Sequence, residues 1–270
     1  MKRNTFFWIL ATLLTLSASV YQRKTGPSYP MKLSYVLNDT IVVSKLPRSG
    51  DTVDKEIDLT SSEYSSAVLH YRVYPSNDNY TNINFVKGKA YLPVQPPAGK
   101  LEYYVSIDGR DYYKDNPLVI RFKGDIAAGV LIPHIIFLFA SMLFGAMTLL
   151  YALFDDRKYI KYTYLTIGAL IIGGLIFGPI VQYQAFGDAW TGFPKGMDLT
   201  DNKTLIAFLF LVLAVIVQKY VRFKDSLKTK KLSRVVTILA ILVLFVIFSI
   251  PHSLHGSQLN PDTGKIETER

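Results

Sequence analysis

Three of the four histidines in this chain are candidates for holding a metal ion or a haem. His134 directly follows Pro133 near the start of an apolar segment, and His252 and His255 follow the end of the last apolar segment. If these positions lie at one depth in a membrane, imidazoles from two helices could ligate a single iron or copper ion. Two interpretations remain open. One is a haem b or copper site, and the other is a set of interfacial histidines bonded to headgroups or backbone.

The loop 187–204 is the second concentration of polar chemistry. Its glycines and its proline predict a compact turn, and Thr200 or Asp201 could cap a helix that begins near Thr204. In one interpretation the loop is a rigid cap on the helices, with its aromatic side chains in the membrane interface. In the other, its carboxylates face the histidines and complete a cation or cofactor pocket. The residues concerned are Asp188, Trp190, Asp198 and Asp201.

The residue types that are missing narrow the chemistry. The chain has no cysteine, which excludes disulfides, iron–sulfur clusters, thiolate zinc sites, covalently attached haem and a cysteine nucleophile. It also has no His-Glu-x-x-His pattern, which disfavours zinc hydrolysis relative to haem b or copper. No catalytic residue is assigned, because neither a Ser-His-Asp spacing nor a pair of carboxylates recommends a hydrolase.

The elements that would position these residues are apolar helices. Residues 126–250 contain four segments with apolar cores, which we expect to form a four-helix transmembrane bundle. These segments are 127–154, 164–186, 205–221 and 235–250. Gly174 and Gly178 predict close helix packing in the second of them. Residues 1–21 have a basic start and a short apolar core, which fits either a retained signal-anchor or a cleaved signal peptide.

The distribution of basic residues predicts the orientation. The connections 155–163 and 219–234 carry ten Lys and Arg residues, whereas the loop 187–204 and the tail 251–270 carry four. Basic loops stay in the cytoplasm. We therefore expect a bacterial inner-membrane protein with residues 22–125, the loop 187–204 and the tail 251–270 outside, in the periplasm. The basic loops at the cytoplasmic face and their contact with anionic lipid explain the net charge of +9, so we expect no nucleic-acid partner.

Residues 22–125 have the pattern of an all-β domain. Short alternating or β-branched runs are separated by turn signals, and Asp108-Gly109 is typical of a two-residue hairpin turn. Six to eight strands at this spacing favour an antiparallel sandwich. The run Pro97 to Val105 resembles the late strand of immunoglobulin-like and fibronectin-like domains, where an alternating Tyr and aliphatic pattern follows a Gly.

Several blocks together resemble a family of bacterial membrane proteins of uncharacterised function. The resemblance covers most of the chain and implies one outer sandwich followed by a four-helix part. It implies no activity. The blocks are residues 21–30, the run Pro-Pro-Ala-Gly-Lys-Leu-Glu-Tyr-Tyr at 96–104, Ile132-Pro133-His134, and residues 190–204.

The leading interpretation is a non-enzymatic integral membrane component of the cell envelope. In this interpretation the outer domain binds an envelope protein or a second copy of the chain, and the helices anchor it in the bilayer. The first alternative is a haem b or copper subunit for electron transfer. A transporter subunit is a further alternative, disfavoured because the apolar segments lack the internal charges that ion-coupled pathways use.

Overall fold

A computed structural model describes most of the chain in two compact units. The helical unit comprises Met1–Gly26, Ile126–Tyr183 and Ala189–Ser253, and the β unit comprises Pro27–Asp125, Gln184–Asp188 and Leu254–Arg270. The residues described are 3–61, 63–154, 156–223, 226–250, 257–260 and 263–268.

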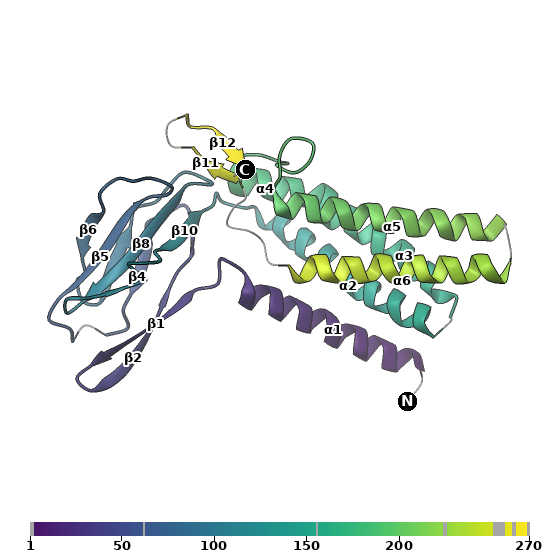
Figure 1. Cartoon of the computed structure of the whole chain (residues 1–270), viewed down its shortest axis with the longest axis horizontal. Coiled ribbons are helices and arrows are strands. Elements are labelled where there is room, and N and C mark those ends of the chain that lie inside the picture. Colours follow the sequence, from purple (N-terminus) through teal and green to yellow (C-terminus); the bar gives the residue numbers. More distant parts are fainter. Residues whose placement is uncertain are drawn as a thin grey trace. The chain divides into compact units, whose positions relative to one another are not determined.

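The helical unit is built from long apolar helices that run side by side (Figure 1). Within the described residues, five helical stretches are long and apolar enough to cross a membrane, as expected of a multi-pass membrane protein. The π-helical segment η1 (Ile171–Phe177) joins α3 and α4 into one of these stretches. The helices are α1 (Arg3–Thr25), α2 (Ala128–Leu153), α3 (Lys158–Leu170), α4 (Gly178–Phe186), α5 (Leu199–Phe223) and α6 (Leu227–Ser249).

The four predicted apolar segments all lie in helices, but the four-helix count is not confirmed. The fifth long helix is α1, whose Phe7 and Ala11 are buried among α2 residues. The Phe7 ring meets the Tyr151 ring edge-on at 5.1 Å. Because α1 extends to Thr25, the β unit begins after residue 22, at Pro27.

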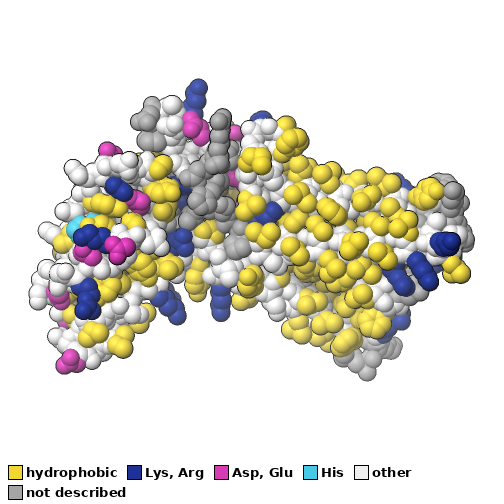
Figure 2. Space-filling view, viewed as in Figure 1, with side chains coloured by type: hydrophobic (Ala, Val, Ile, Leu, Met, Phe, Trp, Pro, Cys, Tyr) yellow, Lys and Arg dark blue, Asp and Glu magenta, His cyan; other side chains and the backbone are white. Residues whose placement is uncertain are grey.

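The basic residues gather at one end of the helical unit. Arg3 at the start of α1 forms an ion pair with Asp156 at 2.5 Å, and Tyr159 in α3 hydrogen-bonds Ser233 in α6 at 3.1 Å. These contacts bring the start of α1, the α2–α3 connection and the start of α6 together. Figure 2 shows Lys and Arg side chains at this end and hydrophobic side chains along the helices. We call it the basic end.

Glycines let the helices approach closely, as predicted for Gly174 but not for Gly178, where a Cβ would meet nothing nearer than 3.6 Å. A Cβ on Gly173 would lie 2.9 Å from the Leu138 nitrogen of α2, and one on Gly174 would lie 3.0 Å from the Thr204 methyl of α5. Gly173 and Gly174 both belong to η1, so α2 and α5 each approach this π-helical segment closely at one glycine.

The β unit contains one large sheet and several two-stranded sheets (Figure 1). The large sheet has the order β3-β10-β8-β5-β6, with β9 paired to β8, and all its pairs are antiparallel except β10–β3. The small sheets are β1–β2, β4–β7 and β11–β12. The strands are β1 (Met31–Leu37), β2 (Thr40–Leu46), β3 (Ser49–Gly50), β4 (Lys55–Asp58), β5 (Ala67–Val73), β6 (Thr81–Asn84), β7 (Lys89–Leu92), β8 (Lys100–Ile107), β9 (Arg110–Tyr112), β10 (Leu118–Phe122), β11 (Ser257–Leu259) and β12 (Ile266–Thr268).

One hydrophobic core joins the large sheet to the β1–β2 and β4–β7 sheets. Leu33 and Leu46 from the β1–β2 hairpin, Ile57 from β4 and Leu69 from β5 belong to a single buried cluster. The predicted turn at Asp108-Gly109 is confirmed, because both residues have positive φ between β8 and β9. The β-rich nature of the domain is therefore as predicted.

Candidate functional site at the Asp201 end of the helices

The end of the helical unit opposite the basic end is organised around Asp201. This residue lies in the first turn of α5 and is only 6% exposed. Its Oδ2 accepts hydrogen bonds from the backbone N–H of Thr191 at 2.6 Å and of Gly192 at 2.9 Å, and from the Gln182 amide at 3.2 Å. A buried carboxylate is stable when several donors surround it, and here the donors come from the loop and from α4.

The neighbours of Asp201 fix the same loop. Asp198 Oδ1 accepts from the Thr200 N–H at 2.7 Å, so Asp198 caps α5, which begins at Leu199. The predicted cap at Thr200 or Asp201 is therefore wrong by two to three residues, because the helix begins earlier than its apolar run. Asn202 Oδ1 accepts from the Phe193 N–H at 2.7 Å and closes the loop from its other side.

Gly192 is required by the close approach of the loop to α5. A Cβ at this position would lie 2.5 Å from the Asp201 Cβ and 2.9 Å from the Asn202 side-chain oxygen. Such distances are far inside ordinary contact, so any larger residue would push the loop away from the Asp201 carboxylate.

Lys203 ties α5 to the end of α6. The side chain is buried, and its ammonium group donates to the Ile250 carbonyl at 2.9 Å. The last carbonyls of a helix have no partner within the helix, so a cation there satisfies an exposed acceptor and favours the helix C-terminus. Lys203 therefore links the two helices at this end.

The remaining predicted loop residues are Asp188 and Trp190. Asp188 belongs to the β unit, and Trp190 belongs to the helical unit. The Trp190 indole donates to the Phe193 carbonyl at 3.0 Å, and the Phe193 ring is 64% exposed. Across the described part of the chain, no group of three or more His, Cys, Asp or Glu side chains is placed to hold a metal ion. The geometry at Asp201 is that of a structural clamp.

His134 is held in a defined orientation by η1. Its Nδ1 lies 2.8 Å from the Gly173 carbonyl oxygen, which can only accept, so Nδ1 carries the proton. When neutral, a ring in this tautomer presents the Nε2 lone pair, and backbone-carbonyl orientation of this kind is typical of ligand histidines. The other two predicted ligands, His252 and His255, lie in 251–256, outside the described residues.

The β unit brings Ser, His and Asp side chains together in an order that differs from a hydrolase triad. His70 Nε2 lies 2.8 Å from Ser106 Oγ, and Ser106 donates to Asp111 at 2.5 Å. The ion pair with Lys114 and the Ser106 hydroxyl lower the pKa of Asp111, which is therefore an ionised acceptor. His70 Nδ1 lies 2.7 Å from Asn82 Oδ1, which only accepts, so the imidazole is bonded on both sides, and the Ser106 hydroxyl is shared between Asp111 and His70.

Sequence reasoning did not identify several members of the Asp201 cluster. They are polar residues whose roles depend on partners nine or more positions away in the sequence, or on burial that no local pattern indicates. The Asp198-Leu199-Thr200-Asp201 run carried a capping signal that could have placed the helix start correctly. The residues missed are Gln182, Thr191, Asn202 and Lys203.

Comparisons with known proteins provide no family for the chain: no family model, curated protein or solved structure matches it.

Proposed function

We propose that the chain is a non-enzymatic integral membrane component of the cell envelope, which binds a protein partner through its β unit and is anchored by its helices. The observation that carries the proposal is the solvent-facing side of the β1–β2 hairpin. We call this side the hairpin face. It consists of Lys32, Ser34, Val36, Ile41, Val43 and Lys45.

The hairpin face exposes apolar side chains at its tip. Val36 and Ile41 are direct cross-strand neighbours and are 61% and 70% exposed, and Val43 lies beside them. The opposite side of the hairpin already fills the core with Leu33 and Leu46. Contiguous exposed apolar side chains on a folded domain favour a protein interaction site.

Charge and backbone add to this argument. Lys32 and Lys45 are directly opposite each other on the same face, an arrangement that disfavours the hairpin unless a negative group approaches. Within the described residues β1 pairs with no strand other than β2, and its second edge is open to a further strand beyond the Lys32 carbonyl, which accepts from the Tyr113 hydroxyl at 2.8 Å. The partner is therefore proposed to present apolar side chains flanked by acidic ones.

The location proposed for the protein is a bacterial inner membrane, with the β unit in the periplasm. Support comes from the basic end, where three chain segments rich in Lys and Arg meet, as expected of a cytoplasmic face. The sheets are compatible with an immunoglobulin-like or fibronectin-like sandwich, which is the finer fold proposed. Membership of a family of bacterial membrane proteins with such an outer domain is likewise proposed.

Residues 1–21 are proposed to be retained as an anchor. Phe7 and Ala11 are buried in the helical unit, and the Tyr151 hydroxyl donates to Asn4 at 3.2 Å. Cleavage after residue 19 would remove all these contacts. The intact mass of the protein purified from membranes distinguishes the two forms, and a mass lacking residues 1–19 would reject retention.

Photo-crosslinking in native membranes tests the partner proposal. A crosslinker at Ile41 should join the chain to one defined protein, whereas a crosslinker at the exposed Asn77, away from the hairpin face, should not. Val36→Lys, in the protein carrying the Ile41 crosslinker, should abolish the product. A crosslinked homodimer would identify a second copy as the partner. Uncrosslinked monomer alone, or equal products from both positions, would reject the hairpin face as the site.

A second candidate function rests on His134. A ring with Nδ1 bonded to a backbone carbonyl is prepared for ligation through Nε2, which favours a haem b or copper site shared with His252 or His255. A visible spectrum and metal analysis of protein produced with haem and copper available test this. The absence of both a Soret band and stoichiometric metal would reject this second candidate function. An absorption band unchanged in both His134→Ala and His252→Ala would reject these ligands.

A further inference from the structure

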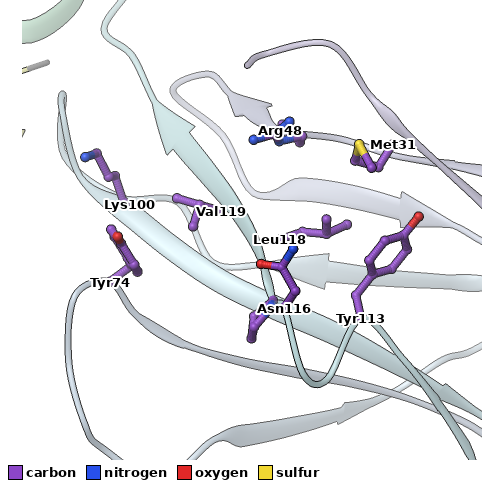
Figure 3. Close-up of a pocket in the computed structure, with 9 residues that line it drawn as sticks. Met31, Arg48, Tyr74, Lys100, Tyr113, Asn116, Leu118 and Val119 are labelled. Carbon is purple, nitrogen blue, oxygen red and sulfur yellow. The ribbon is translucent and has the colours of Figure 1, made fainter. Parts of the chain in front are cut away.

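A small cleft in the β unit is lined by cationic and aromatic side chains (Figure 3). Its volume is about 250 Å³, which corresponds to about eight water molecules at ~30 Å³ each. None of the described residues that line it is acidic. Its polar and aromatic lining consists of Arg48, Tyr74, Lys100, Tyr113 and Asn116.

Arg48 is the most unusual of these residues. Its Nε is buried and makes no hydrogen bond within the described part of the chain. Burial lowers the pKa of Arg48, and the nearby Tyr103 hydroxyl raises it by a smaller amount. The Arg48 side chain as a whole is only partly buried, and a guanidinium with a buried N–H is normally paired with a carboxylate, because taking an unpaired cation out of water is costly.

Lys100 contributes a second cation to the cleft. Only 2% of this residue is exposed, and its ammonium group donates to the neutral amide oxygen of Gln258 at 2.8 Å. It also lies 5.7 Å from the centre of the Tyr74 ring. Figure 3 shows Lys100 and Tyr74 together on one side of Val119 and Arg48 beside Met31 on the other. Positive charge therefore borders a partly aromatic space.

We infer that this cleft binds a small organic anion, one with a carboxylate or phosphate group and an aromatic or apolar body. The anion would provide the counter-charge that Arg48 lacks, and a guanidinium suits both groups because it can donate two parallel hydrogen bonds. Met31, Tyr74 and Tyr113 would contact the apolar body. A volume of about 250 Å³ accommodates a molecule of the size of benzoate. This inference does not depend on the proposed partner of the hairpin face.

Equilibrium titration of the full chain in non-ionic detergent tests the inference. The probes are benzoate and phenyl phosphate, with benzamide as the uncharged control. At least one anion should bind saturably to one site per chain, more weakly as salt increases, and benzamide should bind at least tenfold more weakly. The absence of saturable binding by both anions, or equal binding of benzamide, would overturn the inference.

Three variants locate the site. Arg48→Gln should weaken the binding at least tenfold. Asn116→Asp should also do so, because it places a carboxylate at an exposed position of the cleft where folding is not at risk. Arg110→Gln, an exposed arginine outside the cleft, should bind as the wild type does. Wild-type affinity in both Arg48→Gln and Asn116→Asp would overturn the assignment.

A stability measurement separates a binding role from a structural one. Arg48→Met removes a charged group whose Nε is buried without an acceptor and keeps an apolar stem of similar length, so the ligand-free variant should melt at or above the wild-type temperature. A lower melting temperature would assign Arg48 to the fold and would contradict the inference.

Discussion

Asp201 and Arg48 are both charged residues with buried polar atoms, but the protein treats these atoms in opposite ways. The Asp201 carboxylate receives two backbone N–H groups and the Gln182 amide, and so fixes the loop that precedes α5. The Arg48 Nε–H group finds no acceptor within the described residues, and the Arg48 side chain lines a cleft. A satisfied buried charge is part of the structure, whereas an unsatisfied one indicates a group that is meant to meet a partner.

The largest expected effect follows from removing the Asp201 carboxylate. Asp201→Ala leaves the Thr191 and Gly192 N–H groups buried without an acceptor, which should lower the free energy of unfolding by about 3 kcal/mol. Trp190 lies in this loop and reports its release by fluorescence in a Trp8→Phe background, since the chain has two tryptophans. Asp201→Asn keeps one acceptor oxygen and should lose less. Equal stability of Asp201→Ala and wild type would show that the Asp201 carboxylate does not hold the loop in place.

A substitution at Gly192 should have the next largest effect. Gly192→Ala places a Cβ 2.5 Å from that of Asp201, so the free energy of unfolding should fall by about 2 kcal/mol. Gly168→Ala is the matched control, because a Cβ on this α3 glycine meets nothing within 4 Å. The control should be neutral, or stabilising by about 0.5 kcal/mol. Equal losses in the two variants would show that the loop does not press on α5.

Loss of a buried hydrogen bond beside Arg48 should lower the free energy of unfolding by a smaller amount. The buried Tyr103 hydroxyl donates to the Pro47 carbonyl at 2.6 Å, and burial holds the pKa of Tyr103 well above its usual value. Tyr103→Phe should lower the free energy of unfolding by about 1 kcal/mol, measured by near-ultraviolet circular dichroism. Because Pro47 precedes Arg48, anion affinity should also fall. Unchanged stability would show that this carbonyl needs no partner.

The smallest expected effect concerns the exposed ion pair of Asp111. Lys114 and Ser106 lower the pKa of Asp111, so its stabilisation is present above the unfolded-state pKa of about 3.9 and is lost as pH falls through the folded-state value. Asp111→Asn should cost about 0.5 kcal/mol at neutral pH and flatten the loss of stability below about pH 4. If Asp111→Asn and wild type lost stability identically below about pH 4, ionised Asp111 would not be a source of this pH dependence.

The outcome of the sequence analysis depends on how far apart the interacting residues lie. Apolar helices and the Asp108-Gly109 turn were predicted because a short stretch of chain determines each of them. The start of α5 was misplaced because Leu199 to Lys203 is a polar helical turn that tertiary contacts hold in place. The aspartates of the loop 187–204 looked like ligands, but Asp198 caps α5 and Asp201 is occupied by backbone donors.

The cleft could not be predicted because its residues come from separate elements. Arg48 precedes β3, Lys100 begins β8 and Asn116 precedes β10, and only the folded sheet brings them to one space. Nothing in the residues around Arg48 indicates that its Nε becomes buried without an acceptor. For His134 the sequence identified the residue, while the bond to Gly173 depends on the packing of η1 against α2.

One titration series compares Asp201 and Arg48 most directly, with anion affinity and unfolding measured on the same preparations of wild type, Asp201→Asn and Arg48→Gln. We predict that Asp201→Asn unfolds more easily yet binds the anion with unchanged affinity while folded. Arg48→Gln should be as stable as wild type but should bind at least tenfold more weakly. The opposite assignment, with stability lost in Arg48→Gln and binding lost in Asp201→Asn, would contradict the distinction between a structural and a binding charge.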